Sequence, residues 1–162
     1  MEAKGYISLE GYRRLEAELD RLRRLERPKV VDEVSAAAAQ GDRSENAEYI
    51  YGKKRLREID RRTRWLEKRL EALESVDVDR PRAEARCFFG AWVSVEDEDG
   101  KAATYRIMGE DELDAARGYI SYRSPLGRAI LGKRPGDVCE VQTPSGPREV
   151  AVVGVRYGAP AP

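Results

Sequence analysis

The chain contains no histidine and only two cysteines, Cys87 and Cys139, which lie far apart in the sequence. This excludes imidazole catalysis, Cys–His nucleophile pairs and the common zinc sites, and it predicts no disulfide framework. Nowhere do about 18 consecutive apolar residues occur, and the first residues lack an apolar signal region. We therefore expect a soluble protein of the reducing cytoplasm, with no membrane partner and no tightly bound cofactor.

Charge is abundant but balanced, with 30 basic and 30 acidic residues among 162. Charge at this level is typical of long, solvent-exposed helices rather than of one large core. The zero net charge identifies no partner, but the charge distribution does. Between Lys53 and Arg69, nine basic residues stand against three acidic ones, which leaves a local excess of six positive charges.

The first half of the chain has the apolar spacing of a coiled coil. Apolar residues recur every three or four positions over 12–22 and again over 49–73. Two helices of about 30 residues would each be roughly 45 Å long, and a break as short as 40–46 requires them to run antiparallel. We predict a helical hairpin over residues 1–78.

Three local signals refine this hairpin. Ser8 predicts an N-cap, and Pro28 predicts a kink or restart because it lacks a backbone N–H. The alanines at 36–39 would let the two helices approach closely near the tip.

The second half changes to strand-like periodicity. Residues 79–86 are predicted to form a linker, 87–157 a small, mostly antiparallel sheet domain with one short helix, and 158–162 a frayed tail. Ser124 and Pro125 begin the short helix and Gly132 ends it. The fold class is α+β. The expected strands are 88–95, 102–108, 119–122, 138–143 and 149–157, separated by turns at 99–100, 135–137 and 144–146.

Two carboxylates, Asp42 and Glu45, lie in the hairpin tip. In one interpretation Asp42 is the N-cap of the second helix, and Glu45 completes a capping box. In the other, the two carboxylates share a face of the first turn and supply part of a Mg²⁺ site that another molecule completes. The residues alone leave both interpretations open.

Basic residues recur at spacings of three and four beside the apolar seam of the second helix, as a stripe formed by Lys54, Arg57, Arg61, Arg64 and Lys68. The plain interpretation is a solvated face with intrahelical pairs such as Glu58 with Arg62. Because acids are too few to pair most of these bases, the stripe also favours nucleic-acid phosphates bound without sequence readout. Tyr49 falls in the seam register, whereas Tyr51 faces elsewhere and could stack on a base.

Several stretches together resemble one known family. These are GDRSENAEY, KKRLREIDRRTRWLEKRL, FFGAWVSVED, ISYRSPLGRAILGKRPGD and VQTPSG. They are similar to the bacterial transcript-cleavage factors of the Gre family, and most of all to its GreB-type branch. The resemblance extends from Tyr6 to Tyr157.

This resemblance implies an antiparallel coiled coil followed by an FKBP-like domain. It implies a factor that binds RNA polymerase, inserts the coiled coil into the secondary channel and stimulates Mg²⁺-dependent cleavage of backtracked RNA. The factor would be a cofactor and not an enzyme. Asp42 and Glu45 would be the catalytic metal ligands, sharing Mg²⁺ with polymerase only in the complex. Ser44, Asn46 and Tyr49 would shape the tip, and the RNA 3′ segment would contact Lys53, Lys54, Arg57, Arg61, Arg64 and Lys68.

The docking surface is placed only coarsely, at Tyr122, Ser124, Pro125 and Arg128. Arg123 stands where some members carry an acidic docking residue, so that contact is not transferred. We expect a monomer. Two alternatives remain: a channel-binding polymerase inhibitor, which would differ at the tip, and a non-catalytic helical-hairpin adaptor, which would depend neither on Mg²⁺ nor on backtracked RNA.

Overall fold

The structure of the protein is a computed structural model, and it describes residues 4–41, 43 and 45–161. The chain divides into two compact units. One comprises Met1–Gly11 together with Glu74–Pro162, and the other comprises Tyr12–Leu73. The α+β class predicted from the sequence is confirmed, and each unit is described below by itself.

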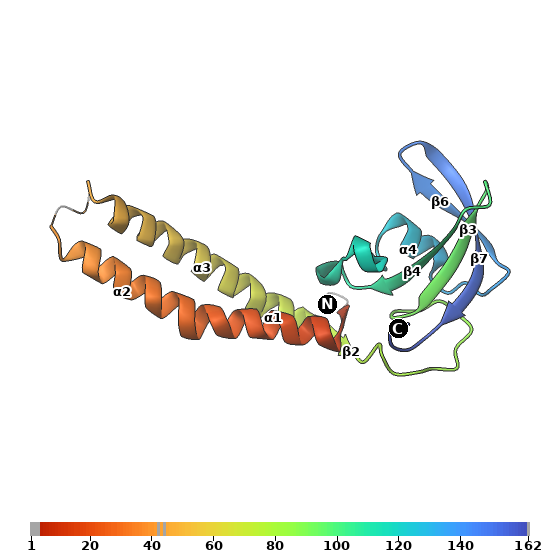
Figure 1. The fold of residues 1–162 in the computed structure, drawn as a ribbon, viewed down its shortest axis with the longest axis horizontal. Helices are drawn as coiled ribbons and strands as arrows, with labels where there is room; N and C mark the ends of the chain where they lie inside the picture. The colour runs from red at the N-terminus through yellow and green to blue at the C-terminus, as the bar shows by residue number, and fades with distance from the viewer. Residues whose placement is uncertain (1–3, 42, 44, 162) are drawn as a thin grey trace. The chain divides into compact units, whose positions relative to one another are not determined.

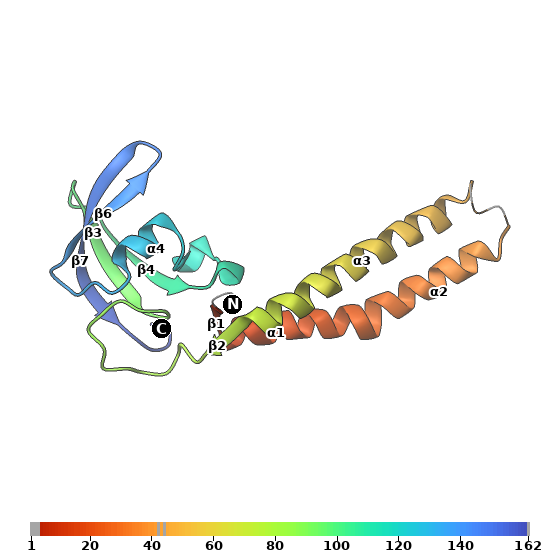
Figure 2. The same ribbon diagram turned by 180° about the vertical axis from the view of Figure 1, so that it is seen from behind.

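The helical unit is the expected antiparallel hairpin. Helix α1 (Leu9–Arg21) continues through a π-helical turn (Leu22–Glu26) into α2 (Arg27–Ala38), and α3 (Ala47–Ala72) returns. Figures 1 and 2 both show α2 and α3 side by side. Of the seam predicted from the spacing, Leu15, Leu19, Leu22, Ile59 and Leu66 are buried, and the other members are mostly half-buried. Val30 and Ala37 of α2 are buried as well.

Local sequence signals explain how this hairpin is built. The Ser8 hydroxyl accepts a hydrogen bond from the Gly11 N–H at 3.0 Å, which confirms Ser8 as the cap of α1. Pro28 lies in the first turn of α2, directly after the π-helical turn, so the helix restarts where the proline cannot donate. Near the tip, a Cβ on Gly52 would come within 2.5 Å of the Val34 side chain, so glycine permits the close helix approach there.

Two strands were not expected from the sequence. Strands β1 (Gly5–Ser8) and β2 (Leu73–Val76) pair as a separate two-stranded sheet. Both are four residues long, so neither shows enough period-two alternation to be separated from the adjoining helical pattern.

The globular unit contains a five-stranded sheet in the order β5-β4-β3-β7-β6. Its neighbouring strands pair antiparallel except β4 and β5, which are parallel. The short helix α4 (Pro125–Ile130) contributes Ile130 to a core with Val93, Ile107 and Val152. The strands are β3 (Trp92–Asp97), β4 (Ala102–Met108), β5 (Tyr119–Ser121), β6 (Val138–Thr143) and β7 (Gly146–Arg156), with 3₁₀ turns at Glu110–Glu112 and Ala115–Arg117.

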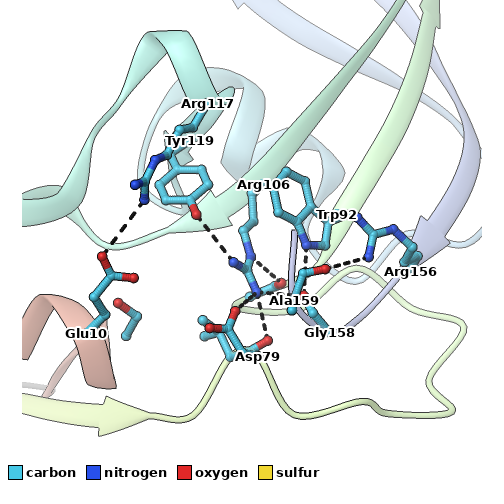
Figure 3. A network of polar contacts seen from close by, with 12 residues as sticks. Glu10, Asp79, Trp92, Arg106, Arg117, Tyr119, Arg156, Gly158 and Ala159 are labelled. Carbon is cyan, nitrogen blue, oxygen red and sulfur yellow. Dashed lines mark hydrogen bonds and ion pairs between the residues drawn. The ribbon is translucent and has the colours of Figure 1, made fainter. Parts of the chain in front are cut away.

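A buried arginine organises the segments that flank this sheet. The side chain of Arg106 is almost fully enclosed, and its guanidinium donates to the carbonyls of Gly90, Val78 and Gly158. It also pairs with Asp79 at 3.1 Å and lies 4.7 Å from the centre of the Trp92 ring, as Figure 3 shows. Because every unpaired buried donor is costly, this arginine ties residues 78–79 and 158 to the sheet.

The frayed tail predicted for 158–162 needs correction at its first residues. Gly158 is buried, and its carbonyl accepts from both Trp92 Nε1 and Arg106 at 3.0 Å. The Ala159 carbonyl accepts from Arg156 at 3.0 Å. These bonds hold the chain beyond β7 against the sheet. They are made by backbone carbonyls, so the small side chains of the tail sequence gave no sign of them. Pro162 lies outside the described residues.

Candidate functional site

The hairpin tip is capped differently from the sequence prediction. Helix α3 begins at Ala47 with Asn46 as its N-cap, and the Asn46 side-chain oxygen accepts from the Tyr49 N–H at 3.1 Å. The prediction that Asp42 caps this helix and Glu45 lies in its first turn is therefore wrong. Glu45 precedes the helix in a turn. Glu45 is therefore not on a face of the first helical turn, as the second interpretation required. Asp42 and Ser44 lie outside the described residues.

The Asn46 side chain also spans the hairpin. Its amide nitrogen donates to the Ala37 carbonyl in the last turn of α2 at 2.7 Å. An aspartate could cap α3 but could not donate this second bond. Tyr49, one turn inside the helix, is half-buried, and the Arg43 guanidinium lies 5.7 Å from the centre of its ring. Asn46 and Tyr49 are thus both built into the tip.

Glu45 is exposed and forms no ion pair with any residue that the structure describes. Across those same residues, no cluster of three or more acidic, cysteine or histidine side chains could hold a metal ion. Since Mg²⁺ prefers six oxygen ligands and commonly keeps several waters, a projecting carboxylate fits a site completed by another molecule. It does not fit a metal centre within this chain.

Three acids of α3, Glu58, Asp60 and Glu67, pair with arginines outside the stripe. Asp60 accepts a hydrogen bond from Arg27 at 2.9 Å, and Glu67 pairs with Arg23 in the π-helical turn on the other side of the hairpin. Glu58 lies 3.5 Å from Arg55, which also pairs with Glu26. These contacts place the acidic side chains toward the other helix or toward Arg55.

Arg62 is bound in the same way. Its guanidinium donates two hydrogen bonds to the Glu18 carboxylate, at 2.8 and 2.9 Å, so it belongs to the cross-hairpin contacts. The hydrogen bonds from Arg62 lower the pKa of Glu18, and the bond from Arg27 lowers the pKa of Asp60. Both carboxylates are therefore held in the charged form.

Six bases remain directed to solvent. All six are exposed and have no ion pair within 4.0 Å among the described residues, although Arg64 adds a smaller electrostatic contribution to the lowered pKa of Asp60. These six, which we call the basic stripe from here on, are Lys53, Lys54, Arg57, Arg61, Arg64 and Lys68. Of the nine basic residues between Lys53 and Arg69, these six thus lack an ion pair among the described residues, whereas the other three have partners.

The predicted docking residues lie together at the start of α4. Ser124 caps the helix by accepting from the Gly127 N–H at 3.0 Å, and Tyr122 accepts from the Tyr6 N–H at 3.2 Å. Pro125 and Arg128 are exposed. Arg123 lies 3.5 Å from Glu110 and 5.4 Å from the centre of the Tyr122 ring.

An apolar pocket beside these residues was missed by sequence reasoning. It has a volume of about 380 Å³, and its lining includes Ser124, Ile120, Tyr105 and Leu113. Leu113 is 61% exposed. The sequence feature that could have indicated this pocket is Leu113, the one apolar residue in the acidic run from Glu110 to Asp114. This leucine does not belong to any amphipathic pattern.

Comparison with known proteins identifies the family of the chain. Residues 5–74 match the model described as "Transcription elongation factor, N-terminal", and residues 82–157 match "Transcription elongation factor, GreA/GreB, C-term". The chain is 54% identical to transcription elongation factor GreB of Yersinia pestis, over 97% of this chain and 91% of that protein. It is 55% identical to GreB of Pseudomonas aeruginosa, over 96% of this chain and 92% of that protein.

The chain belongs to the GreA/GreB family of transcription elongation factors, and to its GreB type. It therefore acts on transcription together with RNA polymerase, as a cofactor and not as an enzyme of its own. Among solved structures, the GreA factor homolog 1 (Gfh1) of Thermus thermophilus aligns at 25% identity and a TM-score of 0.42, covering 94% of this chain and 98% of that one.

No helix among the described residues is both long enough and apolar enough to span a bilayer.

Proposed function

We propose that this GreB-type factor stimulates cleavage of backtracked RNA by delivering the carboxylates of its hairpin tip to the active centre of RNA polymerase. The proposal rests on the position and exposure of Glu45. Its side chain is exposed, the residue lies ahead of α3, and it forms no ion pair with any described residue. Asp42, three residues earlier in the sequence, would be the second ligand. A carboxylate without an internal partner remains available to a metal held by another protein.

Asp42 and Glu45 would hold Mg²⁺ jointly with polymerase ligands and the RNA phosphate. Bound there, the ion would stabilise charge on the attacking and leaving oxygens of phosphodiester hydrolysis. The chain's own contribution is the position of the ligands. Asn46 fixes the start of α3 relative to the end of α2, and so it fixes the ends of the segment that carries both carboxylates.

The basic stripe would contact the extruded 3′ segment of the RNA. Its six side chains are exposed and lack ion pairs among the described residues, while three acids of α3, Glu58, Asp60 and Glu67, pair with other arginines. Phosphate contacts of this kind release counterions and require no particular base sequence. They suit RNA of any sequence that backtracking extrudes.

The globular unit would dock on polymerase through the start of α4. Pro125 and Arg128 offer exposed groups there, and the pocket beside Ser124 with the exposed Leu113 offers an apolar contact. A small apolar site with a polar rim is the usual composition of a specific interface. We further propose that the factor works in the cytoplasm as a monomer.

The test uses purified bacterial RNA polymerase halted on a template and backtracked by a defined number of nucleotides. Adding the chain with Mg²⁺ should shorten the RNA from its 3′ end, and neither the chain alone nor polymerase alone should do so at a comparable rate. Binding to polymerase without shortened RNA would instead favour a channel-binding inhibitor. Shortening of free RNA by the chain without polymerase would overturn the assignment as a cofactor.

A further inference from the structure

Two large aromatic side chains of α3 lie beside the basic stripe but outside the apolar seam. Tyr51 is 71% exposed and Trp65 is 42% exposed. On a helix, residues three or four apart are neighbours. Lys54 follows Tyr51 by three positions, and Trp65 lies four after Arg61 and three before Lys68. Each ring therefore borders a base of the stripe.

Packing within the hairpin does not account for these rings. The buried contacts of α3 are made by Gly52, Ile59 and Leu66, in a different register. Tyr51 forms no ring–ring or cation–ring contact with any residue that the structure describes. It lines a pocket with Val30, Glu33 and Arg55 and leaves most of its surface in solvent.

Trp65 has a further feature that favours stacking. The Arg62 guanidinium lies 4.5 Å from the centre of its ring, and Arg62 is itself held by two hydrogen bonds to Glu18. The cation is thus fixed over one face of the ring and restricts the positions that the ring can take. An ordered aromatic ring loses less conformational freedom on binding than a mobile one.

We propose that Tyr51 and Trp65 are stacking platforms for the bases of single-stranded RNA whose phosphates lie along the basic stripe. This inference rests on the proposed function and adds to it a class of contact, base stacking, that charge alone does not supply. A basic track combined with exposed aromatic rings is the arrangement by which proteins hold single strands without sequence preference, because every base presents a π-face.

The spacing of the two rings assigns them different ranges. They are separated by 14 positions, which is about 21 Å along a helix at 1.5 Å per residue. Tyr51 lies close to the tip and is within reach of a short extruded strand. Trp65 lies much further from the tip and is reached only by a longer strand. Tyr51 therefore serves every backtracked complex and Trp65 only the deeply backtracked ones.

The direct test measures binding of the full chain to a mixed-sequence, single-stranded oligoribonucleotide. Tyr51→Leu or Trp65→Leu should weaken binding at least about fivefold, the lower end of the range for one lost base–aromatic stack. Tyr51→Phe and Trp65→Phe keep a ring and should stay within about twofold of the unaltered chain. Ile50→Ala is the matched control, because Ile50 is 51% exposed on the same helix but has no ring; it should change nothing.

Salt dependence separates stacking from charge. The ring variants should keep the slope of log Kd against log salt, whereas Arg57→Glu with Arg61→Glu should reduce it, because only the charge variants remove phosphate contacts. If the charge variant loses RNA binding while both Leu variants bind normally, the stacking inference fails and the RNA role of the stripe stands. If the charge variant also binds normally, the proposed RNA contact itself fails.

Cleavage assays test the assignment of ranges. Tyr51→Leu should slow cleavage in both short and deeply backtracked complexes, and Trp65→Leu only in the deep ones. Circular dichroism should show unchanged helix content in each variant, since neither side chain belongs to the buried seam of the hairpin. Equal slowing of both complexes by Trp65→Leu, or a similar loss in Ile50→Ala, would overturn the platform assignment in favour of a general apolar contact with polymerase.

Discussion

The side-chain amide of Asn46 donates to the backbone carbonyl of Ala37 at 2.7 Å, while its oxygen accepts from the backbone N–H of Tyr49 at 3.1 Å. One side chain therefore caps the start of α3 and joins it to the last turn of α2. The segment between these helices carries the two carboxylates that we propose as metal ligands. Their delivery depends on how firmly this residue closes the hairpin.

Replacing Asn46 should separate its two functions. Asn46→Ser keeps a good N-cap but cannot reach Ala37, whereas Asn46→Ala removes both bonds. An N-cap is worth about 1 kcal/mol, so the alanine variant should be about 1 kcal/mol less stable than the serine variant. Denaturant unfolding followed by helix signal measures this. Equal stabilities of the two variants would show that the cap contributes nothing here.

The same residue shows what the sequence could and could not predict at the tip. The hairpin was predictable because a three-and-four spacing of apolar residues persists over both helices. The start of α3 was not, because Asp42, Ser44 and Asn46 are all good N-caps by residue type. The hydrogen bond to Ala37 joins the two helices and favours Asn46 as the N-cap. A contact between two helices cannot be predicted from the local sequence around the cap.

Neutralising the tip carboxylates should reduce cleavage without reducing binding. Asp42→Asn and Glu45→Gln remove the negative charge that a metal requires, and Glu45 contributes no ion pair within the described residues whose loss would destabilise the hairpin. Cleavage of backtracked RNA should fall by orders of magnitude, while the Kd for polymerase stays within a few-fold. Both quantities are measurable on the same halted complexes. Loss of binding or of helix content in Glu45→Gln would mean that this carboxylate is structural.

The Glu18–Arg62 pair should make the hairpin sensitive to acid. Hydrogen bonds from Arg62 lower the pKa of Glu18 below 4.5. A carboxyl group with a lowered folded-state pKa stabilises the fold above its unfolded pKa, and this contribution disappears as the pH falls through the folded-state pKa. Because the pair is partly exposed to solvent, with the Arg62 side chain 44% and the Glu18 side chain 26% exposed, its coupling should be only about 0.5 kcal/mol.

A double-mutant cycle checks this coupling. Glu18→Gln, Arg62→Met and the double variant, unfolded at pH 7 and again near pH 3, should give a coupling that is present at pH 7 and much smaller at pH 3. Arg24→Met provides a control on the same side of the hairpin as Glu18, since among the described residues Arg24 forms its ion pair with the exposed Asp20 at 3.6 Å. A coupling that does not change between the two pH values would contradict the ion-pair assignment.

In the globular unit too, features set by neighbouring residues were predictable from the sequence, and contacts between distant segments were not. The limits of β4 and β6, the Ser124 cap and the glycine turns follow the sequence closely, because each rests on a local pattern. The role of Arg106 was hidden, since an arginine within a strand usually predicts an exposed face. Its hydrogen-bond partners lie 13 to 52 positions away in the sequence, and only the assembled fold brings them together.

The two thiols should react only when the globular unit opens. Burial raises the pKa of Cys87 to about 11 from 9.0, and burial also raises the pKa of Cys139. At pH 8 the thiolate fraction of Cys87 should be roughly 100-fold below that of an exposed thiol. Alkylation should therefore be slow in buffer and fast in denaturant. The stability of the unit should also decline from about pH 9 to pH 11, because the unfolded thiol ionises first.

Reversing the charge of the basic stripe should affect deeply backtracked complexes most. Arg57→Glu with Arg61→Glu removes two of the six exposed, uncompensated bases and leaves the cross-hairpin pairs of Arg23, Arg27 and Arg62 intact. A longer extruded strand makes more phosphate contacts along α3, so the charge reversal should reduce its cleavage rate more than that of a short strand. The difference between the two complexes should shrink as the salt concentration rises. The matched control is Lys101→Glu with Arg134→Glu, which changes the net charge equally on exposed residues of the globular unit. Cleavage rates on complexes backtracked by two and by ten or more nucleotides, at low and high salt, give the comparison; equal losses on both at every salt concentration would show that the stripe acts in docking and not on the RNA.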